Sequence, residues 1–308
     1  MTFTLEGLYV PLITPFTADG ELARAALERL AHEMLDAGAA GLVALGTTGE
    51  PATLSGAERR DVMDICASAC RARGATLIAG AGSNDTAASA RALAELAAWP
   101  EVSAALTVVP YYTRPSPEGV LAHFARLAGV SPVPLVVYNI PYRTGVSLGW
   151  RTLRALASVP GVIGLKHAVG GIDADTITFL ADAPRDFAVL GGDDAFISPL
   201  LALGAAGGIL AAAHVRTGEF AALVAAWRAG DVARARALGN GLVPLATALF
   251  AEPNPAGIKG VLHAQGRIPS PAVRLPLLPA GEESVRAALA VAGGAASVGE
   301  VAGGALAG

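Results

Sequence analysis

The feature that most constrains the fold is a regular alternation of short apolar runs with longer helical patterns. Eight apolar runs have the length of buried strands, at residues 7–13, 41–45, 76–79, 102–109, 134–137, 162–165, 187–190 and 207–210. Helical patterns lie between them, as at residues 22–37, 57–71, 86–98, 118–128 and 217–227. This alternation is typical of βαβ units, whose strands are parallel. Units of roughly 29 residues are the size found in an eight-unit barrel of about 250 residues.

The eight runs favour a closed barrel over an open sheet. They are continuously apolar, as expected for strands covered on both faces. No G-x-G-x-x-G follows the first run, which weakens the alternative of a doubly wound sheet. We therefore predict an α/β fold, a (β/α)8 TIM barrel, over residues 1–229.

Only helical patterns follow the barrel. They lie at residues 232–250, 256–265 and 282–291, and they predict a C-terminal helical region over residues 230–292. The last stretch, residues 293–308, is rich in glycine and alanine without periodicity. We predict a flexible tail there.

Charge and hydropathy narrow the range of partners. A formal net charge of -4 provides no basic surface for nucleic acid or acidic lipid. Every apolar run is interrupted before the roughly 18 residues that a membrane span needs. The first residues lack the basic and apolar segments of a signal peptide. The sequence therefore predicts a cytoplasmic protein that binds neither nucleic acid nor membrane.

No metal or serine-hydrolase motif accompanies the barrel pattern. Cys66 and Cys70 lie four residues apart in a helical pattern, without a CxxC motif, and are predicted to be core thiols. No His/Cys/Asp cluster has metal-ligand spacing, and no G-x-S-x-G string is present. We therefore predict no metal site.

The residues after each predicted strand should share one face of the barrel, where active sites are built. They are mainly hydroxyl-bearing residues and glycines, with one amine, Lys166. Of 22 basic residues only Lys166 and Lys259 are lysines, and arginine cannot form a Schiff base. Lys166 follows an apolar run, so its amine should project into a dry barrel mouth that favours the uncharged form. Lys259 falls in the C-terminal region, far from this mouth, and is predicted to be structural.

Each neighbouring candidate also has a structural interpretation. Lys166 could simply reach water at a strand end. The turn Gly46–Gly49 could bind a small carboxylate at the start of a helix, although such residues are common in turns. Tyr138 could relay a proton or only make a hydrogen bond at the core edge. Arg143, in the loop after Tyr138, could bind a second carboxylate or remain solvated.

Six strings, in this order, remove much of that ambiguity. They are Gly-Thr-Thr-Gly-Glu, Pro-Tyr-Tyr-Thr-Arg-Pro, Tyr-Asn-Ile-Pro-Tyr-Arg-Thr-Gly, Ile-Gly-Leu-Lys, Gly-Gly-Asp-Asp and Glu-Pro-Asn-Pro. Together they resemble the dihydrodipicolinate synthase and N-acetylneuraminate lyase family over residues 7–279. Such an ordered set is specific for pyruvate-dependent lyases of this family.

The resemblance implies a class I aldolase-type mechanism without a cofactor. Lys166 would condense with pyruvate, and the resulting enamine would attack a small aldehyde. In the members that this chain resembles most, the aldehyde is aspartate semialdehyde and the product enters lysine and diaminopimelate biosynthesis. Tyr138 and Thr47 would relay protons, together with Tyr112 from a neighbouring subunit. The family is commonly a homotetramer, a dimer of dimers.

The resemblance also implies four substrate contacts. Thr48 would contact the pyruvate carboxylate and Arg143 the carboxylate of the semialdehyde. The backbones of Gly192 and Ile209 would line the pocket.

The sequence departs from the synthase pattern at three places. His167 stands where an acid is usual, Tyr142 where a small residue is usual, and residues 211–213 are alanines where Ser or Thr is usual. These departures are expected to affect the second substrate more than pyruvate. A lyase or dehydratase acting on a sugar-derived keto acid is therefore one alternative, which Arg143 disfavours. A non-catalytic keto-acid-binding protein is another.

Overall fold

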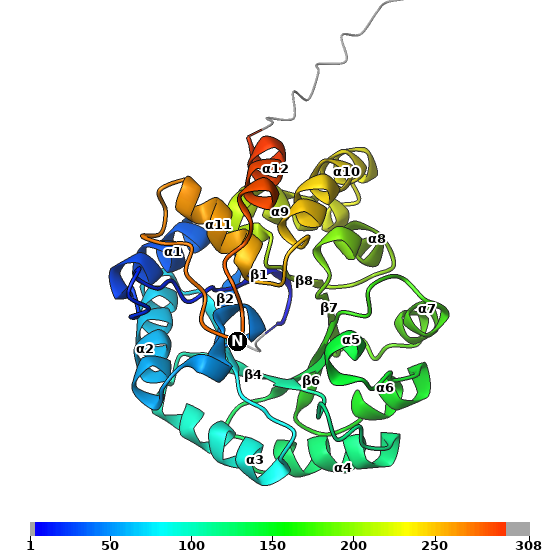
Figure 1. The fold of residues 1–308 in the computed structure, drawn as a ribbon. Coiled ribbons are helices and arrows are strands. Elements are labelled where there is room, and N and C mark those ends of the chain that lie inside the picture. The colour runs from blue at the N-terminus through cyan, green and yellow to red at the C-terminus, as the bar shows by residue number, and fades with distance from the viewer. Residues whose placement is uncertain (1–3, 294–308) are drawn as a thin grey trace, which may run out of the picture.

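The strands form one closed barrel in a computed structural model that describes residues 4–293. Within those residues, eight parallel strands pair in sequence order, and β8 pairs back onto β1 (Figure 1). Their bounds are β1 Gly7–Pro11, β2 Gly41–Ala44, β3 Thr76–Gly80, β4 Val102–Val108, β5 Leu135–Asn139, β6 Val162–His167, β7 Ala188–Gly191 and β8 Gly207–Ile209. The predicted TIM barrel is confirmed, and the doubly wound alternative is wrong.

The strand ends differ from the prediction where polar residues continue a strand. β5 runs on through Tyr138 to Asn139 and β6 through Lys166 to His167, although both were predicted to stop at the apolar residue before. Backbone pairing is indifferent to side-chain polarity, so the ladder continues to the rim of the barrel. Tyr138 and Lys166 consequently lie side by side in register.

Helices surround the barrel and cover its outer face (Figure 1). Some agree with predicted patterns, and α2 begins with the Ser55–Glu58 capping box. The short helices α6 to α8 were not predicted, because six to eight residues give little helical periodicity. The bounds are α1 Arg24–Asp36, α2 Gly56–Arg73, α3 Thr86–Glu95, α4 Pro117–Ala128, α5 Pro141–Thr144, α6 Trp150–Leu156, α7 Ala174–Ala181, α8 Ile197–Ala202 and α9 Ala213–Arg228, with 3-10 turns η1 Thr47–Gly49, η2 Pro51–Thr53, η3 Leu96–Ala98 and η4 Asp194–Phe196.

Up to residue 293, where the described part of the chain ends, three further helices follow α9, as predicted: α10 Val232–Leu249, α11 Ala256–Ala264 and α12 Glu282–Ala292. They pack on one another and on α9 at one side of the ring, beside α1 (Figure 1). The division of the chain between residues 229 and 230 stays a prediction. The predicted tail lies outside the described residues, apart from Gly293.

The core has two layers. The interior of the barrel is filled by side chains such as Tyr9, Val43 and Ile78, while a larger cluster lies between the strands and the helices. Cys66 and Cys70 belong to the outer cluster, and burial raises the pKa of both thiols, which confirms them as core residues. No helix in the described part of the chain is long and apolar enough to cross a membrane.

Candidate active site

A cavity of about 610 Å³ lies at the carboxyl ends of the strands. Such cavities at this face of a TIM barrel are the usual location of the active site. Seven of the eight predicted site residues line it, namely Thr47, Thr48, Tyr138, Arg143, Lys166, Gly192 and Ile209. The fold therefore brings together residues that lie up to 162 positions apart in the sequence, from Thr47 to Ile209.

Lys166 is the buried amine of this cavity. Only 6% of the residue is exposed, and Nζ lies 4.3 Å from the centre of the Tyr138 ring on the neighbouring strand. Burial lowers the pKa of Lys166 to about 8, although the nearby carboxylates of Asp194 and Asp193 favour the ammonium. More free amine is therefore present near neutral pH than for a solvated lysine, and nucleophilic attack on a ketone requires this form.

Gly192 gives the Lys166 side chain its space. A β-carbon at this position would lie 2.9 Å from Cβ of Ala168 and 3.0 Å from Cε of Lys166. A larger residue would therefore push the amine out of its place. The requirement for glycine here is steric, since the methyl group of Ala168 and the stem of Lys166 leave no room for a β-carbon.

Tyr138 faces Lys166 with a protonated phenol. Burial raises the pKa of Tyr138 well above its usual value, and negative charge on Tyr142 would act in the same direction. The nearby Thr47 hydroxyl only partly offsets this increase. A phenol that stays protonated can donate a proton and regain it from a neighbouring hydroxyl, which is the behaviour of a relay.

The turn that carries Thr47 and Thr48 lies at the start of a helix, as expected, but this helix is short. It is the three-residue 3-10 turn η1, and α2 begins only at Gly56. The interruption arises because Glu50 adopts a left-handed conformation that ends the turn. Thr48 is buried, and its hydroxyl oxygen accepts a hydrogen bond of 2.9 Å from Nδ2 of Asn254. The first N–H groups of a 3-10 turn lack partners within the turn, so they remain available to an anion.

Arg143 lies in the one-turn helix α5 and not in a loop as predicted. Its Nε donates a hydrogen bond of 2.9 Å to the hydroxyl oxygen of Tyr142, and its guanidinium carbon lies 5.0 Å from the centre of that ring. Both side chains line the cavity. Tyr142 thus occupies Nε and leaves the terminal nitrogens of Arg143 for a carboxylate.

Tyr112 is the one predicted site residue that does not line the cavity. It follows β4, and it is 88% exposed with a positive φ of 66°. This conformation is uncommon for a bulky residue and directs a large aromatic side chain into solvent. Its role in a neighbouring subunit stays a prediction.

Three acidic residues of the cavity, Asp193, Asp194 and Glu252, received no role from the sequence, and the first two are close to Lys166. Asp194 is buried, and burial raises its pKa to about 7, while Oδ1 accepts a hydrogen bond of 2.6 Å from the backbone N–H of Ala212. Burial also raises the pKa of Asp193, whose Oδ2 accepts a 2.7 Å hydrogen bond from Gly170. The available signal was the pair of acids directly after a strand in the Gly-Gly-Asp-Asp string.

The departures from the synthase pattern lie at different depths. Tyr142 and Ala211 line the cavity, as expected for residues near the second substrate. His167 does not line it, because successive residues of a strand point to opposite faces. Its Nε2 lies 2.8 Å from the hydroxyl oxygen of Thr176 in α7, and burial lowers its pKa to about 4. A direct effect of His167 on the second substrate was therefore wrongly expected.

The C-terminal region supplies a wall of the cavity that the sequence did not predict. Residues of α10 and of the segment after it line the cavity, among them Ala246, Thr247, Phe250 and Asn254. Lys259 was predicted to lie far from the mouth, and this is also wrong, because its Nζ contacts the carboxylate of Glu50 next to η1. No group of three or more His, Cys, Asp or Glu side chains within residues 4–293 is placed to hold a metal ion.

The barrel and its buried lysine define a lyase of the class I aldolase type. The model of the dihydrodipicolinate synthetase family matches residues 4–292, and the chain belongs to this family. A relative from Neisseria gonorrhoeae, a 4-hydroxy-tetrahydrodipicolinate synthase, is 40% identical over 292 residues, which are 94% of this chain and 99% of the relative.

Solved structures agree with this assignment. The dihydrodipicolinate synthase from Acinetobacter baumannii, solved with pyruvate, superposes with a TM-score of 0.89 at 34% identity, covering 94% of this chain and 99% of that chain. A monomeric dihydrodipicolinate synthase variant superposes with a TM-score of 0.89 at 31% identity, covering 93% of this chain and 95% of that one.

Proposed function

We propose that this chain condenses pyruvate with L-aspartate 4-semialdehyde to give 4-hydroxy-tetrahydrodipicolinate, in lysine and diaminopimelate biosynthesis. The observation that carries the proposal is the buried amine of Lys166, with its lowered pKa, under the phenol of Tyr138. The relatives named as this synthase, at about 40% identity across nearly their full length, support the choice of substrates.

In the proposed mechanism, Lys166 acts as the nucleophile. Its free amine adds to the keto carbon of pyruvate, and loss of water leaves an imine. Loss of a proton from the methyl carbon gives the enamine, which attacks the aldehyde carbon of the second substrate. The amino group of that substrate then closes on the imine carbon and releases Lys166. Tyr138 and Thr47 carry the protons, with Tyr112 of a neighbouring subunit as the third member of the relay.

Each substrate has its own carboxylate site in this proposal. The η1 turn holds the pyruvate carboxylate through Thr48 and the N–H groups at its start, and the Gly192 and Ile209 backbones form another part of the cavity wall. Arg143 receives the carboxylate of the semialdehyde through the nitrogens that Tyr142 leaves unoccupied. The two sites lie on different elements, so they can be tested separately.

Arg143→Ala is expected to raise the KM for aspartate semialdehyde by about 10- to 100-fold, the value of a lost charge-assisted pair. Steady-state assays with each substrate varied in turn measure this, alongside trapping of the pyruvate imine with borohydride, which should be unchanged. Arg151→Ala is the matched control, because Arg151 stacks on Trp150 in α6 and does not line the cavity. If Arg143→Ala raises the KM for both substrates equally, the role of Arg143 is contradicted. If the wild type turns over only sugar-derived keto acids, the proposed acceptor is contradicted.

The rate of imine formation is expected to rise with pH and to level off above about pH 8, because the reacting form is the free amine and the pKa of Lys166 is about 8. Initial rates of trapping by cyanoborohydride at saturating pyruvate measure this profile. Burial is the main cause of this lowered pKa; Asp194 and Asp193 raise it in part, and Arg143 lowers it further. Since Asp194 favours the ammonium, Asp194→Asn should move the midpoint to lower pH. A rate that keeps rising to pH 10, as for a solvated lysine, is incompatible with a desolvated amine.

Assembly and location are part of the same proposal. The exposed Tyr112 is suited to insertion into a second copy, and the assembly that we propose is the homotetramer, a dimer of dimers, that the family resemblance implies. The family also contains a monomeric variant, so family membership alone does not fix the assembly. We place the enzyme in the cytoplasm, where amino-acid precursors are made.

A further inference from the structure

The segment from Asn254 to Lys259, which includes the first half of α11, contacts the η1 turn and the residue that follows it. Lys259 in the middle of α11 reaches Glu50, the residue that ends the turn. Asn254, two residues before α11, reaches the hydroxyl oxygen of Thr48 within the turn. Both contacts join residues more than 200 positions apart in the sequence. The turn that we assign to the pyruvate carboxylate is thus attached to an element outside the barrel.

The contact with Lys259 is a fully buried ion pair. Lys259 has no exposed surface, and Glu50 is also buried. Nζ of Lys259 donates to Oε1 of Glu50 and to the carbonyl oxygen of Ala272 at 2.9 Å, and it lies 4.1 Å from the centre of the Phe16 ring. Buried ion pairs contribute little net stability, because desolvation offsets their attraction. A role in fixing local geometry accounts for the pair better than a role in overall stability.

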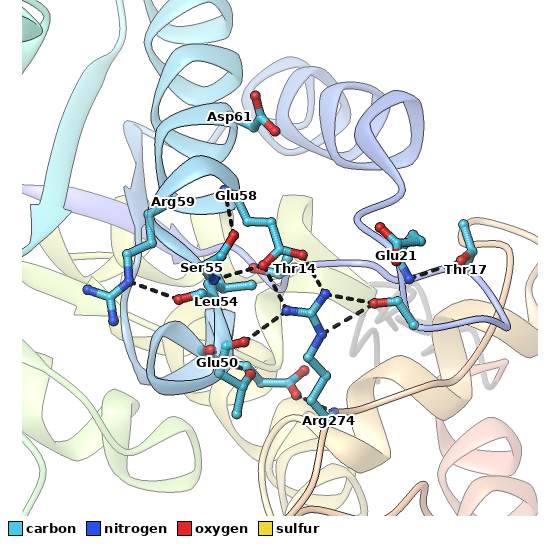
Figure 2. Close-up of polar contacts among 12 residues, drawn as sticks. Thr14, Thr17, Glu21, Glu50, Leu54, Ser55, Glu58, Arg59, Asp61 and Arg274 are labelled. Carbon is cyan, nitrogen blue, oxygen red and sulfur yellow. Dashed lines mark hydrogen bonds and ion pairs between the residues drawn. The ribbon is translucent and has the colours of Figure 1, made fainter.

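Glu50 connects the buried ion pair to the η1 turn. Its φ of 53° and ψ of 42° are left-handed values that residues other than glycine rarely adopt. Oε2 of its carboxylate accepts a hydrogen bond of 2.9 Å from the backbone N–H of Arg274, so both oxygens are held. Figure 2 shows this carboxylate beside Arg274, whose guanidinium donates a hydrogen bond to the carboxylate of Glu58 in α2. The side chain is therefore restrained on both sides while the backbone makes an unusual bend.

The contact with Asn254 orients the Thr48 hydroxyl. Nδ2 of Asn254 donates to the hydroxyl oxygen of Thr48 at 2.9 Å, which occupies one acceptor site. The Thr48 hydroxyl keeps its own hydrogen, which can then point towards the cavity that both residues line. An acceptor such as a carboxylate oxygen in that cavity would receive it.

From these contacts we infer that Lys259, Glu50 and Asn254 are positioning residues for the pyruvate carboxylate site, holding η1 in its binding geometry from outside the barrel. The inference rests on the proposed function, since η1 is the site assigned to that carboxylate. None of the three residues reacts with substrate. They act through Thr47, Thr48 and the first N–H groups of the turn.

Glu50→Gln tests the inference directly. The amide can accept only one of the two hydrogen bonds that the carboxylate accepts, so the turn loses one restraint. We expect the pyruvate concentration for half-maximal borohydride trapping to rise by about 10-fold or more, the effect of a lost hydrogen bond to a charged group. The extent of trapping at saturating pyruvate should remain that of the wild type, because Lys166 is untouched.

Glu58→Gln is the matched control for lost stability. It weakens the pair that Glu58 forms with Arg274 in the same network, but Glu58 has no contact with η1. The arginine holds the pKa of Glu58 at about 2, so this variant should have a lower Tm while its half-saturating pyruvate concentration is unchanged. If the half-saturating pyruvate concentration instead rises in both variants in proportion to their loss of Tm, the network is only structural and the inference is overturned.

Asn254→Ala provides a second test of the inference if Glu50→Gln does not fold. It removes one neutral hydrogen bond at a half-buried position and should raise the half-saturating pyruvate concentration about 3- to 10-fold. If Glu50→Gln folds and its half-saturating pyruvate concentration equals that of the wild type, the inference is overturned. If Glu50→Gln does not fold, the same result in Asn254→Ala overturns it. In either case the proposed function remains intact. A wild-type chain that traps no pyruvate refutes the proposed function itself.

Discussion

Lys166→Arg is expected to lower the condensation of pyruvate with aspartate semialdehyde by on the order of 10⁴-fold or more, since the variant lacks the nucleophile. Arginine keeps a positive charge and a similar length, but its guanidinium stays protonated at every accessible pH and cannot add to a ketone. Water cannot replace the amine, because only the imine formed by an amine leads to the enamine that attacks the aldehyde. Product formation measured with both substrates at saturation checks the prediction.

The arginine variant is more informative than an alanine variant. It retains a cation beside Asp193 and Asp194, so a loss of activity cannot be ascribed to an altered charge balance in the cavity. An unchanged Tm and circular dichroism spectrum would show that the fold is intact. Condensation at a tenth of the wild-type rate or more would contradict the assignment of Lys166 as the nucleophile.

Tyr138→Phe is expected to lower kcat by about 10²- to 10⁴-fold, the usual contribution of a positioned proton donor. The substitution keeps the ring that lies 4.3 Å from Nζ of Lys166 and removes only the hydroxyl. Imine trapping should become slower but reach the same extent, because the amine and the carboxylate site remain. Steady-state rates and time courses of trapping separate these two effects.

Tyr9→Phe is the matched control for that experiment. Tyr9 is another buried tyrosine of the barrel, on β1, and burial raises its pKa as it does for Tyr138. It does not line the cavity, so its variant should keep a kcat close to that of the wild type. Similar losses in the two variants would mean that hydroxyl removal damages the barrel generally and that Tyr138 has no special role.

The fold was largely predictable because the signals for a barrel are local. Each strand is a short apolar run, and each long helix has enough turns to show its period, so both can be recognised without tertiary contacts. The errors concern where two of the strands end. β5 and β6 extend through Tyr138 and Lys166 because a pairing partner continues alongside them, and that partner is not visible in the run itself.

Seven of the eight predicted site residues line the cavity together, whereas the residues that support the η1 turn were not singled out in the sequence. Lys166 was identifiable because it is one of only two lysines, and the ordered strings supplied roles for its neighbours. The support of η1 depends on Lys259 and Asn254, which approach it from the far end of the chain. Contacts between residues so far apart produce no recognisable pattern in a single sequence. Lys259 was therefore predicted to lie far from the cavity.

The environment of the charged groups was equally hidden in the sequence. Asp194 owes its raised pKa, about 7, mainly to burial, and this burial depends on the packing of α10 on the η4 turn. His167 was expected to affect the second substrate, yet its side chain is on the opposite face of β6 from Lys166. Both results follow from side-chain direction and depth, which become definite only when the barrel is closed.

The most direct test of the account is to identify the residue that pyruvate labels. The wild-type protein is incubated with pyruvate and borohydride, digested, and mapped by mass spectrometry. The account predicts a single reduced pyruvyl adduct on Lys166, which is absent from Lys166→Arg. An adduct on Lys259, or no adduct at any pyruvate concentration, would contradict it.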